Sequence, residues 1–191
     1  MKNLSLKYHH NIHIVISTRD PLERWISAYN WDLHLYYSQE KYYCPVEAIE
    51  LFRQYPNAKS LISGLMLEEV GAIELAQKKH FTFGHMSRGV GWYISRDFLQ
   101  KIPSFNLSVI STSRLAKDFE EFVRQISKRY EIVGLTPPVK FERSNVGQSS
   151  NYPTNYFSTL LDFSIDERDF LREYLRNDFN IHNDLLELTN N

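Results

Sequence analysis

A short apolar run that leads directly into a well-signalled helix start constrains this chain more than any other feature. Residues 12–18 (IHIVIST) are rich in β-branched side chains, and Arg19, Asp20 and Pro21 end the run. Such a run is typical of a buried strand in a parallel sheet. Asp20 suits a helix N-cap, Pro21 the first helical position, and Glu23 follows three residues after the cap. The sequence therefore predicts a buried strand that passes straight into a capped helix.

The rest of the chain alternates between helix-like and strand-like segments. The helix after the first strand is expected to pack on the sheet through one apolar face, formed by Leu22, Ile26, Tyr29 and Leu33. Further helices are expected at 46–54, 67–79, 92–101, 114–130 and 165–177, with strands at 80–84 and 107–112 and a long polar loop at 144–156. A Pro-Asn turn and Gly64 separate the first two of these helices. This order predicts an α/β fold, a parallel sheet flanked by helices, in one domain over residues 1–191.

Composition excludes several classes of partner and site. The formal net charge of −1 gives no global attraction to nucleic acid or to an acidic membrane, so an anionic ligand needs a local cluster. Cys44 is the only cysteine, which rules out an internal disulfide and the common cysteine-based zinc sites. The histidines do not pair with carboxylates at metal-ligand spacing, so no metal is expected. Residues 1–10 are polar, so we expect no membrane span and a cytoplasmic protein.

The strand end and helix start form a candidate anion site. An arginine after a strand, next to the backbone N–H groups and positive dipole of a helix start, lies where open α/β sheets bind ligands. Arg19 can contact a phosphate bidentately, and Ser27 can donate a hydroxyl from the same side of the helix as Arg24. The alternative is a cap, a surface charge and a small helix residue with no shared role. Their combination directly after an apolar strand favours the site.

This arrangement resembles the PAPS-dependent sulfotransferase superfamily, and within it the carbohydrate, heparan-sulfate-type branch. Its members take a sulfuryl group from 3′-phosphoadenosine 5′-phosphosulfate (PAPS) and release the 3′,5′-bisphosphate PAP. The resemblance implies a P-loop-NTPase-like sulfotransferase fold and a carbohydrate or glycolipid hydroxyl as acceptor. It implies that Arg19, Arg24, Ser27 and Asn145 bind the cofactor. Shorter similarities lie at 57–60, 113–115, 118–119, 149–150 and 174–179.

Two departures from the family pattern bear on activity. The family's loop of Lys and Gly, Ser or Thr, which holds the 5′-phosphosulfate, has no counterpart in the sequence, so we expect an N-terminally incomplete domain. Ser113 stands where relatives have Glu. A catalytically inactive, sulfotransferase-like binding protein is therefore the alternative. A nucleotide kinase ranks lower, because it needs the same loop and an acidic magnesium site.

The sequence gives the least evidence for the identity of the catalytic base. His85 follows Gly84 at the end of a predicted strand, which would place its imidazole at the same sheet edge as Arg19. A hydrogen-bonded structural histidine is the alternative. Other local candidates are His9, His10 and His13. Four tyrosines could stack on sugar or adenine, or else pack in the core: Tyr36, Tyr37, Tyr42 and Tyr43.

Overall fold

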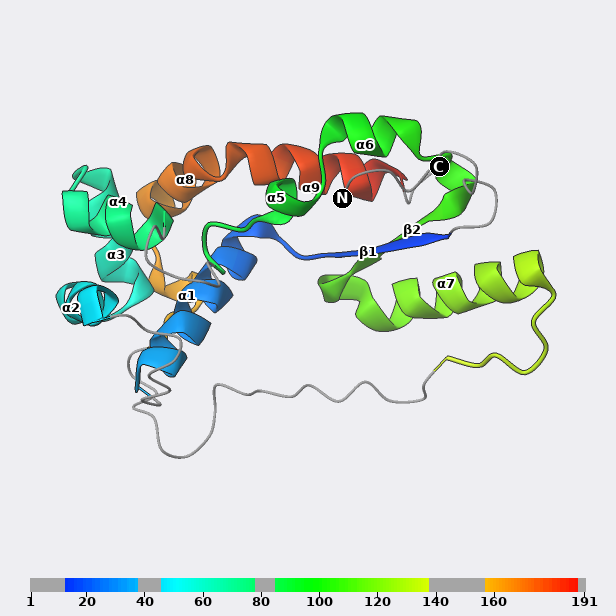
Figure 1. The fold of residues 1–191 in the computed structure, drawn as a ribbon, viewed down its shortest axis with the longest axis horizontal. Helices are drawn as coiled ribbons and strands as arrows, with labels where there is room; N and C mark the ends of the chain where they lie inside the picture. Colours follow the sequence, from blue (N-terminus) through cyan, green and yellow to red (C-terminus); the bar gives the residue numbers. More distant parts are fainter. Residues whose placement is uncertain (1–12, 38–45, 78–84, 138–156, 189–191) are drawn as a thin grey trace. The chain divides into compact units, whose positions relative to one another are not determined.

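The structure, a computed structural model, describes residues 13–37, 46–77, 85–137 and 157–188, and their contacts divide the chain into two compact units. The strand unit comprises Met1–Arg19, Ile94–Arg143 and Ile181–Asn191, and the helical unit comprises Asp20–Tyr93 and Ser144–Asn180. Helices dominate the described residues, with one small parallel sheet among them (Figure 1). The mixed α/β class is confirmed in this form, and the single domain over 1–191 stays a prediction. Every helix within the described ranges is too short or too polar to span a bilayer.

Two parallel strands form the centre of the strand unit. They are β1 (Ile14–Thr18) and β2 (Leu107–Ser111), at the two positions where the sequence predicts buried strands. The register places Ile16 opposite Val109, and both side chains are buried. Val15, on the other face of β1, is 44% exposed. The parallel pairing predicted for this sheet is therefore confirmed for two strands.

Helices cover this sheet and connect to its ends. Helix α7 (Leu115–Tyr130) follows β2 and packs on it, where the sequence predicts a helix at 114–130 (Figure 1). Helix α6 (Arg96–Lys101) lies before β2, and the C-terminal part of α9 (Arg176–Leu188) belongs to the same unit. The Thr18 hydroxyl and His182 Nδ1 lie 2.8 Å apart, and both side chains are buried. This hydrogen bond fixes α9 to the end of β1.

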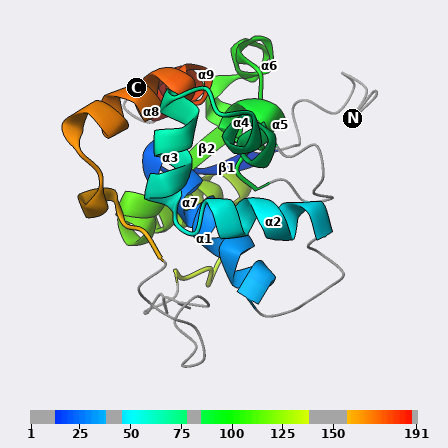
Figure 2. The same cartoon turned by 90° about the vertical axis from the view of Figure 1, so that its left-hand side faces the viewer.

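The helical unit has its core between helices. Its elements are α1 (Pro21–Tyr37), α2 (Val46–Gln54), α3 (Ala58–Met66), α4 (Val70–Gln77), α5 (Val90–Tyr93) and α8 (Ile165–Tyr174). The four residues of the predicted face of α1 are each at most 3% exposed. That face lies in the core cluster, and α1 contacts α2, α3 and α8. Figure 2 shows α2 and α3 beside α1. The expectation that this face packs on the sheet is thus corrected: it contributes to a core of helices.

Several predicted boundaries shift for identifiable reasons. The predicted helix at 67–79 is α4, which begins only at Val70 because Glu68 has a positive φ of 56° and breaks the chain direction. Gly64 does not separate helices but is buried inside α3. The helix at 92–101 is two short helices, of which α6 begins at an N-cap formed by Ser95. The strand at 80–84 and the loop at 144–156 lie outside the described residues.

The last predicted helix is confirmed at its start and shorter at its end. Ser164 and Glu167 form the predicted capping box, with the Ser164 N–H donating to the Glu167 carboxylate at 2.7 Å. Helix α8 ends at Tyr174, where Leu175 leaves the helical geometry. A second helix, α9, then continues the chain, and the sequence did not predict it.

Candidate functional site

The Arg-Asp-Pro segment has the local geometry that the sequence predicts. The Asp20 Oδ1 atom accepts hydrogen bonds from the N–H groups of Leu22 at 2.9 Å and Glu23 at 3.1 Å, and α1 begins at Pro21. Pro21 has no N–H, so the first N–H groups of the helix already have an acceptor. A helix start binds anions through such groups when they are unoccupied. The expected backbone contribution to anion binding is therefore corrected, and a phosphate here depends on side chains.

Two of the predicted phosphate-binding side chains are exposed. Arg19 directly follows β1 and belongs to the strand unit, whereas Ser27 lies on the second turn of α1 in the helical unit. A guanidinium and a hydroxyl in these positions are accessible to a ligand in solvent. Their joint binding of one phosphate stays a prediction, because they belong to different units.

Arg24, the third predicted cofactor-binding residue, holds a turn against α1. Its Nη1 donates to the carbonyl oxygens of His85 at 2.8 Å and Arg88 at 3.0 Å, and its Nη2 donates to that of Met86 at 3.1 Å. Burial lowers the pKa of Arg24, and the charge of Asp178 opposes that shift. The guanidinium therefore anchors this turn, while cofactor binding by Arg24 stays a prediction.

His85, the predicted base, forms a hydrogen-bonded pair with Asp32 of α1. His85 Nδ1 lies 2.7 Å from Asp32 Oδ1, and the side chains are 42% and 3% exposed, respectively. An ionised carboxylate only accepts hydrogen bonds, so when Asp32 is ionised and the His85 ring is neutral, Nδ1 carries the proton and Nε2 is the basic nitrogen. A buried carboxylate that orients an accessible imidazole in this way suits general-base chemistry.

Sequence reasoning missed Asp32, although one signal was present. Asp32 lies between Trp31 and Leu33, and it continues the i, i+4, i+8 row of α1 that starts at Arg24. A carboxylate that is buried in a helix face needs a hydrogen-bonding partner. That requirement can be inferred from sequence, but the partner, 53 residues further on, cannot.

The remaining predicted contacts divide into packing residues and residues outside the description. Tyr36 stacks on Phe52, with ring centroids 5.6 Å apart and planes 18° apart, so for this tyrosine the packing alternative is confirmed. Tyr37 is the last residue of α1. The candidates that lie outside the described residues are His9, His10, Tyr42, Tyr43, Asn145, Ser149 and Ser150.

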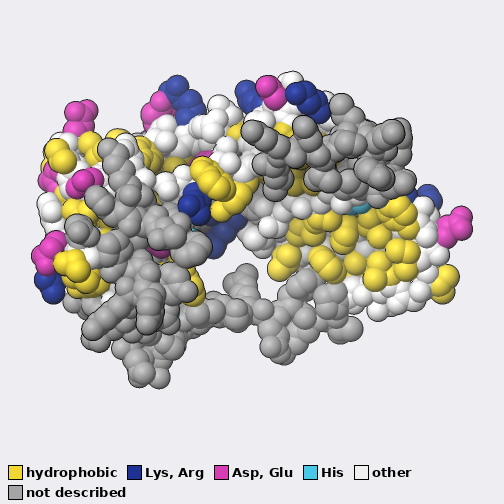
Figure 3. Space-filling model, in the orientation of Figure 1, with side chains coloured by type: hydrophobic (Ala, Val, Ile, Leu, Met, Phe, Trp, Pro, Cys, Tyr) yellow, Lys and Arg dark blue, Asp and Glu magenta, His cyan; other side chains and the backbone are white. Residues whose placement is uncertain are grey.

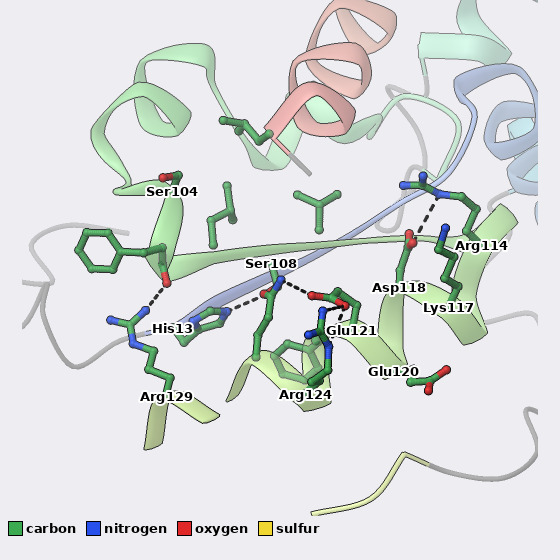
Figure 4. A pocket seen from close by; sticks show the side chains of 16 residues that line it. His13, Ser104, Ser108, Arg114, Lys117, Asp118, Glu120, Glu121, Arg124 and Arg129 are labelled. Carbon is green, nitrogen blue, oxygen red and sulfur yellow. Dashed lines mark hydrogen bonds and ion pairs between the residues drawn. The ribbon is translucent and has the colours of Figure 1, made fainter. Parts of the chain in front are cut away.

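A cavity of about 990 Å³ lies in the strand unit, lined mainly by β2 and α7 (Figure 4). His13 Nε2 lies 2.8 Å from the Ser108 hydroxyl at this cavity. Burial, together with the charge of Arg129, lowers the pKa of His13. Figure 4 shows the arginines engaged within the cavity wall: Arg114 with Asp118, Arg124 with Glu121, and Arg129 with the Phe105 carbonyl. The carboxylates of Asp118 and Glu121 offset the charges of Arg114 and Arg124, whereas the Phe105 carbonyl leaves the charge of Arg129 in place.

Residues 113–115, one of the shorter similarities to the family, lie at the turn between β2 and α7. Asp118 Oδ2 accepts a hydrogen bond from the Ser111 N–H at 2.9 Å, and the Ser111 and Ser113 hydroxyls lie 2.8 Å apart. Arg114 lies 3.4 Å from Asp118. These contacts give Ser113 and Asp118 a structural role in closing the turn.

Comparison with known proteins gives no relative: no family model, no curated protein and no solved structure matches this chain. Across the described ranges, no three His, Cys, Asp or Glu side chains are grouped where they could hold a metal ion. Within the helical unit, the candidate site therefore consists of a capped helix start, an arginine-anchored turn and the His85–Asp32 pair.

Proposed function

We propose that this chain is a sulfotransferase-family domain that transfers a sulfuryl group from PAPS to a hydroxyl of a carbohydrate or glycolipid. One observation carries the proposal: β1 passes through Arg19 and the Asp20 cap into α1, where Ser27 is exposed on the second turn. The family that this segment resembles binds the 3′-phosphate of PAPS there. The same proposal assigns the mixed α/β architecture to a P-loop-NTPase-like sulfotransferase fold.

The side chains divide the work of binding and chemistry. Arg19 contacts the 3′-phosphate through two guanidinium N–H groups, and Ser27 donates its hydroxyl to the same phosphate. Because Asp20 occupies the helix N–H groups and is itself anionic, these two side chains supply most of the attraction. Arg24 supports the site indirectly, through the turn that carries His85.

His85 is the general base in this proposal, and Asp32 positions it. The Nε2 atom removes the proton from the acceptor hydroxyl while that oxygen attacks sulfur. The bond between sulfur and the 5′-phosphate oxygen breaks, and PAP leaves with the electron pair. The proton remains on His85, where the buried Asp32 carboxylate, 2.7 Å away, stabilises the imidazolium. The step needs no oxidant and no metal ligand from the chain.

A catalytically inactive binding protein is the second candidate, favoured because residues 1–191 contain no phosphosulfate-loop motif. Lys59 and Ser60, the nearest Lys-Ser pair to such a loop, form the first turn of α3. Asn57 and Ser60 make its capping box, so the N–H group of Ser60 is already bonded to Asn57. Such a protein binds PAP but transfers no sulfate, so binding and transfer have to be measured separately.

Calorimetric titration with PAP tests the binding part of the proposal. Arg19→Ala and Ser27→Ala should each weaken PAP about tenfold to a hundredfold, since a hydrogen bond to a charged group contributes about 1.5–3 kcal/mol. Arg172→Ala and Ser63→Ala, which change exposed residues on α8 and α3, are the matched controls and should bind like the wild type. Equal PAP affinity in all five proteins would refute the assignment.

A further inference from the structure

A cleft of about 420 Å³ in the helical unit begins at the turn that carries His85. Met86 and Ser87, the next two residues of that turn, line it, together with residues of α4, α5 and the junction of α8 with α9. The volume falls in the range of roughly 300–1,000 Å³ that is usual for small-molecule sites. Because Arg24 fixes this turn through three carbonyl groups, one wall of the cleft is rigidly held.

An exposed aromatic ring forms part of the cleft lining. Trp92 is 61% exposed and lies edge-on to Tyr93, with ring centroids 4.7 Å apart. The Arg88 guanidinium lies 4.8 Å from the centroid of the Trp92 ring, so it supports one face of the indole. In the region of α5, Figure 3 shows hydrophobic side chains beside basic ones. An indole held in this way presents a flat apolar surface to a ligand.

A carboxylate is fixed in the wall of the same cleft. The Gly91 N–H donates to Asp178 Oδ1 at 2.8 Å. A Cβ atom built on Gly89 would come within 1.7 Å of Asp178 Oδ2, so the carboxylate occupies space that only glycine leaves open. A fixed carboxylate accepts hydrogen bonds from ligand hydroxyls, and the side-chain amides of Gln77 and Asn177 add donors and acceptors in the lining.

We propose that this cleft binds a pyranose sugar, stacked on Trp92 and hydrogen-bonded through its hydroxyls to Asp178. One face of a pyranose ring carries C–H groups that suit an indole, while its edge carries hydroxyls that suit a carboxylate and amides. The described lining contains Asp178 and neither Lys nor Arg, which favours an uncharged polyhydroxyl ligand over a nucleotide phosphate. The assignment of this sugar as the sulfuryl acceptor, next to His85, rests on the proposed function.

Nuclear magnetic resonance of the full chain tests the location of sugar binding. Cellobiose and N,N′-diacetylchitobiose are the probes, and sorbitol and PAP are the comparison ligands. At least one disaccharide should shift the indole N–H signal of Trp92 saturably, while sorbitol and PAP leave it in place. Absence of a shift with both disaccharides, or a saturable shift with PAP instead, would overturn the proposal.

Variants then test the residues. Trp92→Ala should weaken disaccharide binding roughly threefold to tenfold. Binding is measured by saturation transfer from the protein to the sugar. Trp31→Ala removes another exposed tryptophan, on α1, and should bind like the wild type. Asp178→Asn should also weaken binding, because an amide oxygen is a poorer acceptor than a carboxylate. Equal affinities for the Trp92 and Trp31 variants would contradict the stacking role.

The two proposals can fail separately, because the sugar titrations contain no PAP. Disaccharide binding at Trp92 without any PAP binding would refute the sulfotransferase assignment and leave the sugar cleft intact. PAP binding that depends on Arg19 and Ser27, with no response to either disaccharide, would refute the cleft and leave the proposed function intact.

Discussion

Replacing Arg24 with Met tests whether this arginine is the anchor of the His85 turn. The guanidinium donates to the carbonyl oxygens of His85, Met86 and Arg88. Methionine keeps most of the aliphatic stem but supplies no donor, so all three carbonyl oxygens lose this partner. Because the turn also carries the imidazole that pairs with Asp32, the effect reaches the candidate base.

The magnitude follows from the number and the setting of these hydrogen bonds. A bond from a charged donor contributes about 1.5–3 kcal/mol, which gives an upper bound of about 9 kcal/mol for three. The bonds are only partly buried, so water replaces part of the loss. We therefore expect Arg24→Met to lower the free energy of unfolding by about 2–4 kcal/mol. For a chain of this length that corresponds to a fall in Tm of roughly 4–16 °C.

Urea unfolding, followed by circular dichroism, measures this change. The control is Arg172→Met, on α8 of the same unit, where the arginine pairs with Asp169 at 2.7 Å and both side chains are more than half exposed. An exposed pair of this kind contributes about 0.3–0.5 kcal/mol. If Arg24→Met unfolds within about 0.5 kcal/mol of that control, the anchoring role is wrong.

Three further outcomes are expected. Gly64→Ala should destabilise the chain by about 1–3 kcal/mol in urea unfolding, because the new Cβ would lie 2.7 Å from Tyr55 Cε1. This cost outweighs the better helix propensity of alanine. The control Ser63→Ala, at the exposed neighbouring residue, should change the free energy of unfolding little. Burial holds the pKa of His13 below its usual 6.5, so the unfolded chain binds the proton first and stability falls as the pH drops below about 6.5. His13→Gln should reduce that loss between pH 7.5 and 5.5, and an unchanged pH dependence would contradict the assignment. Radiolabelled sulfate transfer from PAPS to a glycan panel should be far slower than about one turnover per second. The hydrogen-bond donors to the 5′-phosphosulfate set the rate, and the motif that supplies them has no counterpart in residues 1–191. Transfer at an ordinary rate would show that another segment replaces that loop.

Features set by neighbouring residues could be predicted from the sequence. The start of α1 is one of them, because Asp20 meets its two N–H partners within three residues. The capping box of Ser164 and Glu167 is another. The parallel strands also follow from local pattern, since β-branched runs that end at polar residues have few alternatives in a compact domain.

Features set by tertiary packing could not be predicted from the sequence. Gly64 has the signature of a helix break, but its missing side chain makes room for Tyr55 and Ala72 where α3 packs on α4. The role of Gly89 is similar, because the Asp178 carboxylate occupies the space beside it. Glycine has the same local signature in both uses, so only the three-dimensional neighbours distinguish a break from a close approach.

The candidate site was predicted in part for the same reason. His85 can be singled out from its place after a predicted strand, but its chemistry depends on Asp32, which comes from another part of the chain. Cofactor binding by Arg24 stays a prediction, but its hydrogen bonds to the His85 turn could not be predicted from the local sequence. The turn that accepts its hydrogen bonds lies 61 to 64 positions further along the chain.

Helix α1 joins the two halves of the proposed reaction, because it carries both Ser27 and Asp32. They lie five positions apart, which is about 7.5 Å along a helix axis. In the proposed function this is the offset along α1 between the phosphate-binding hydroxyl and the carboxylate that positions the base. A substitution that loosens α1, such as Tyr29→Ala in its buried face, should lower PAP binding and sulfate transfer together. Ser27→Ala should lower PAP binding, whereas Asp32→Asn should lower only the transfer step. Equal losses of PAP binding in both of these variants would show that they act through the stability of α1 and not through separate roles.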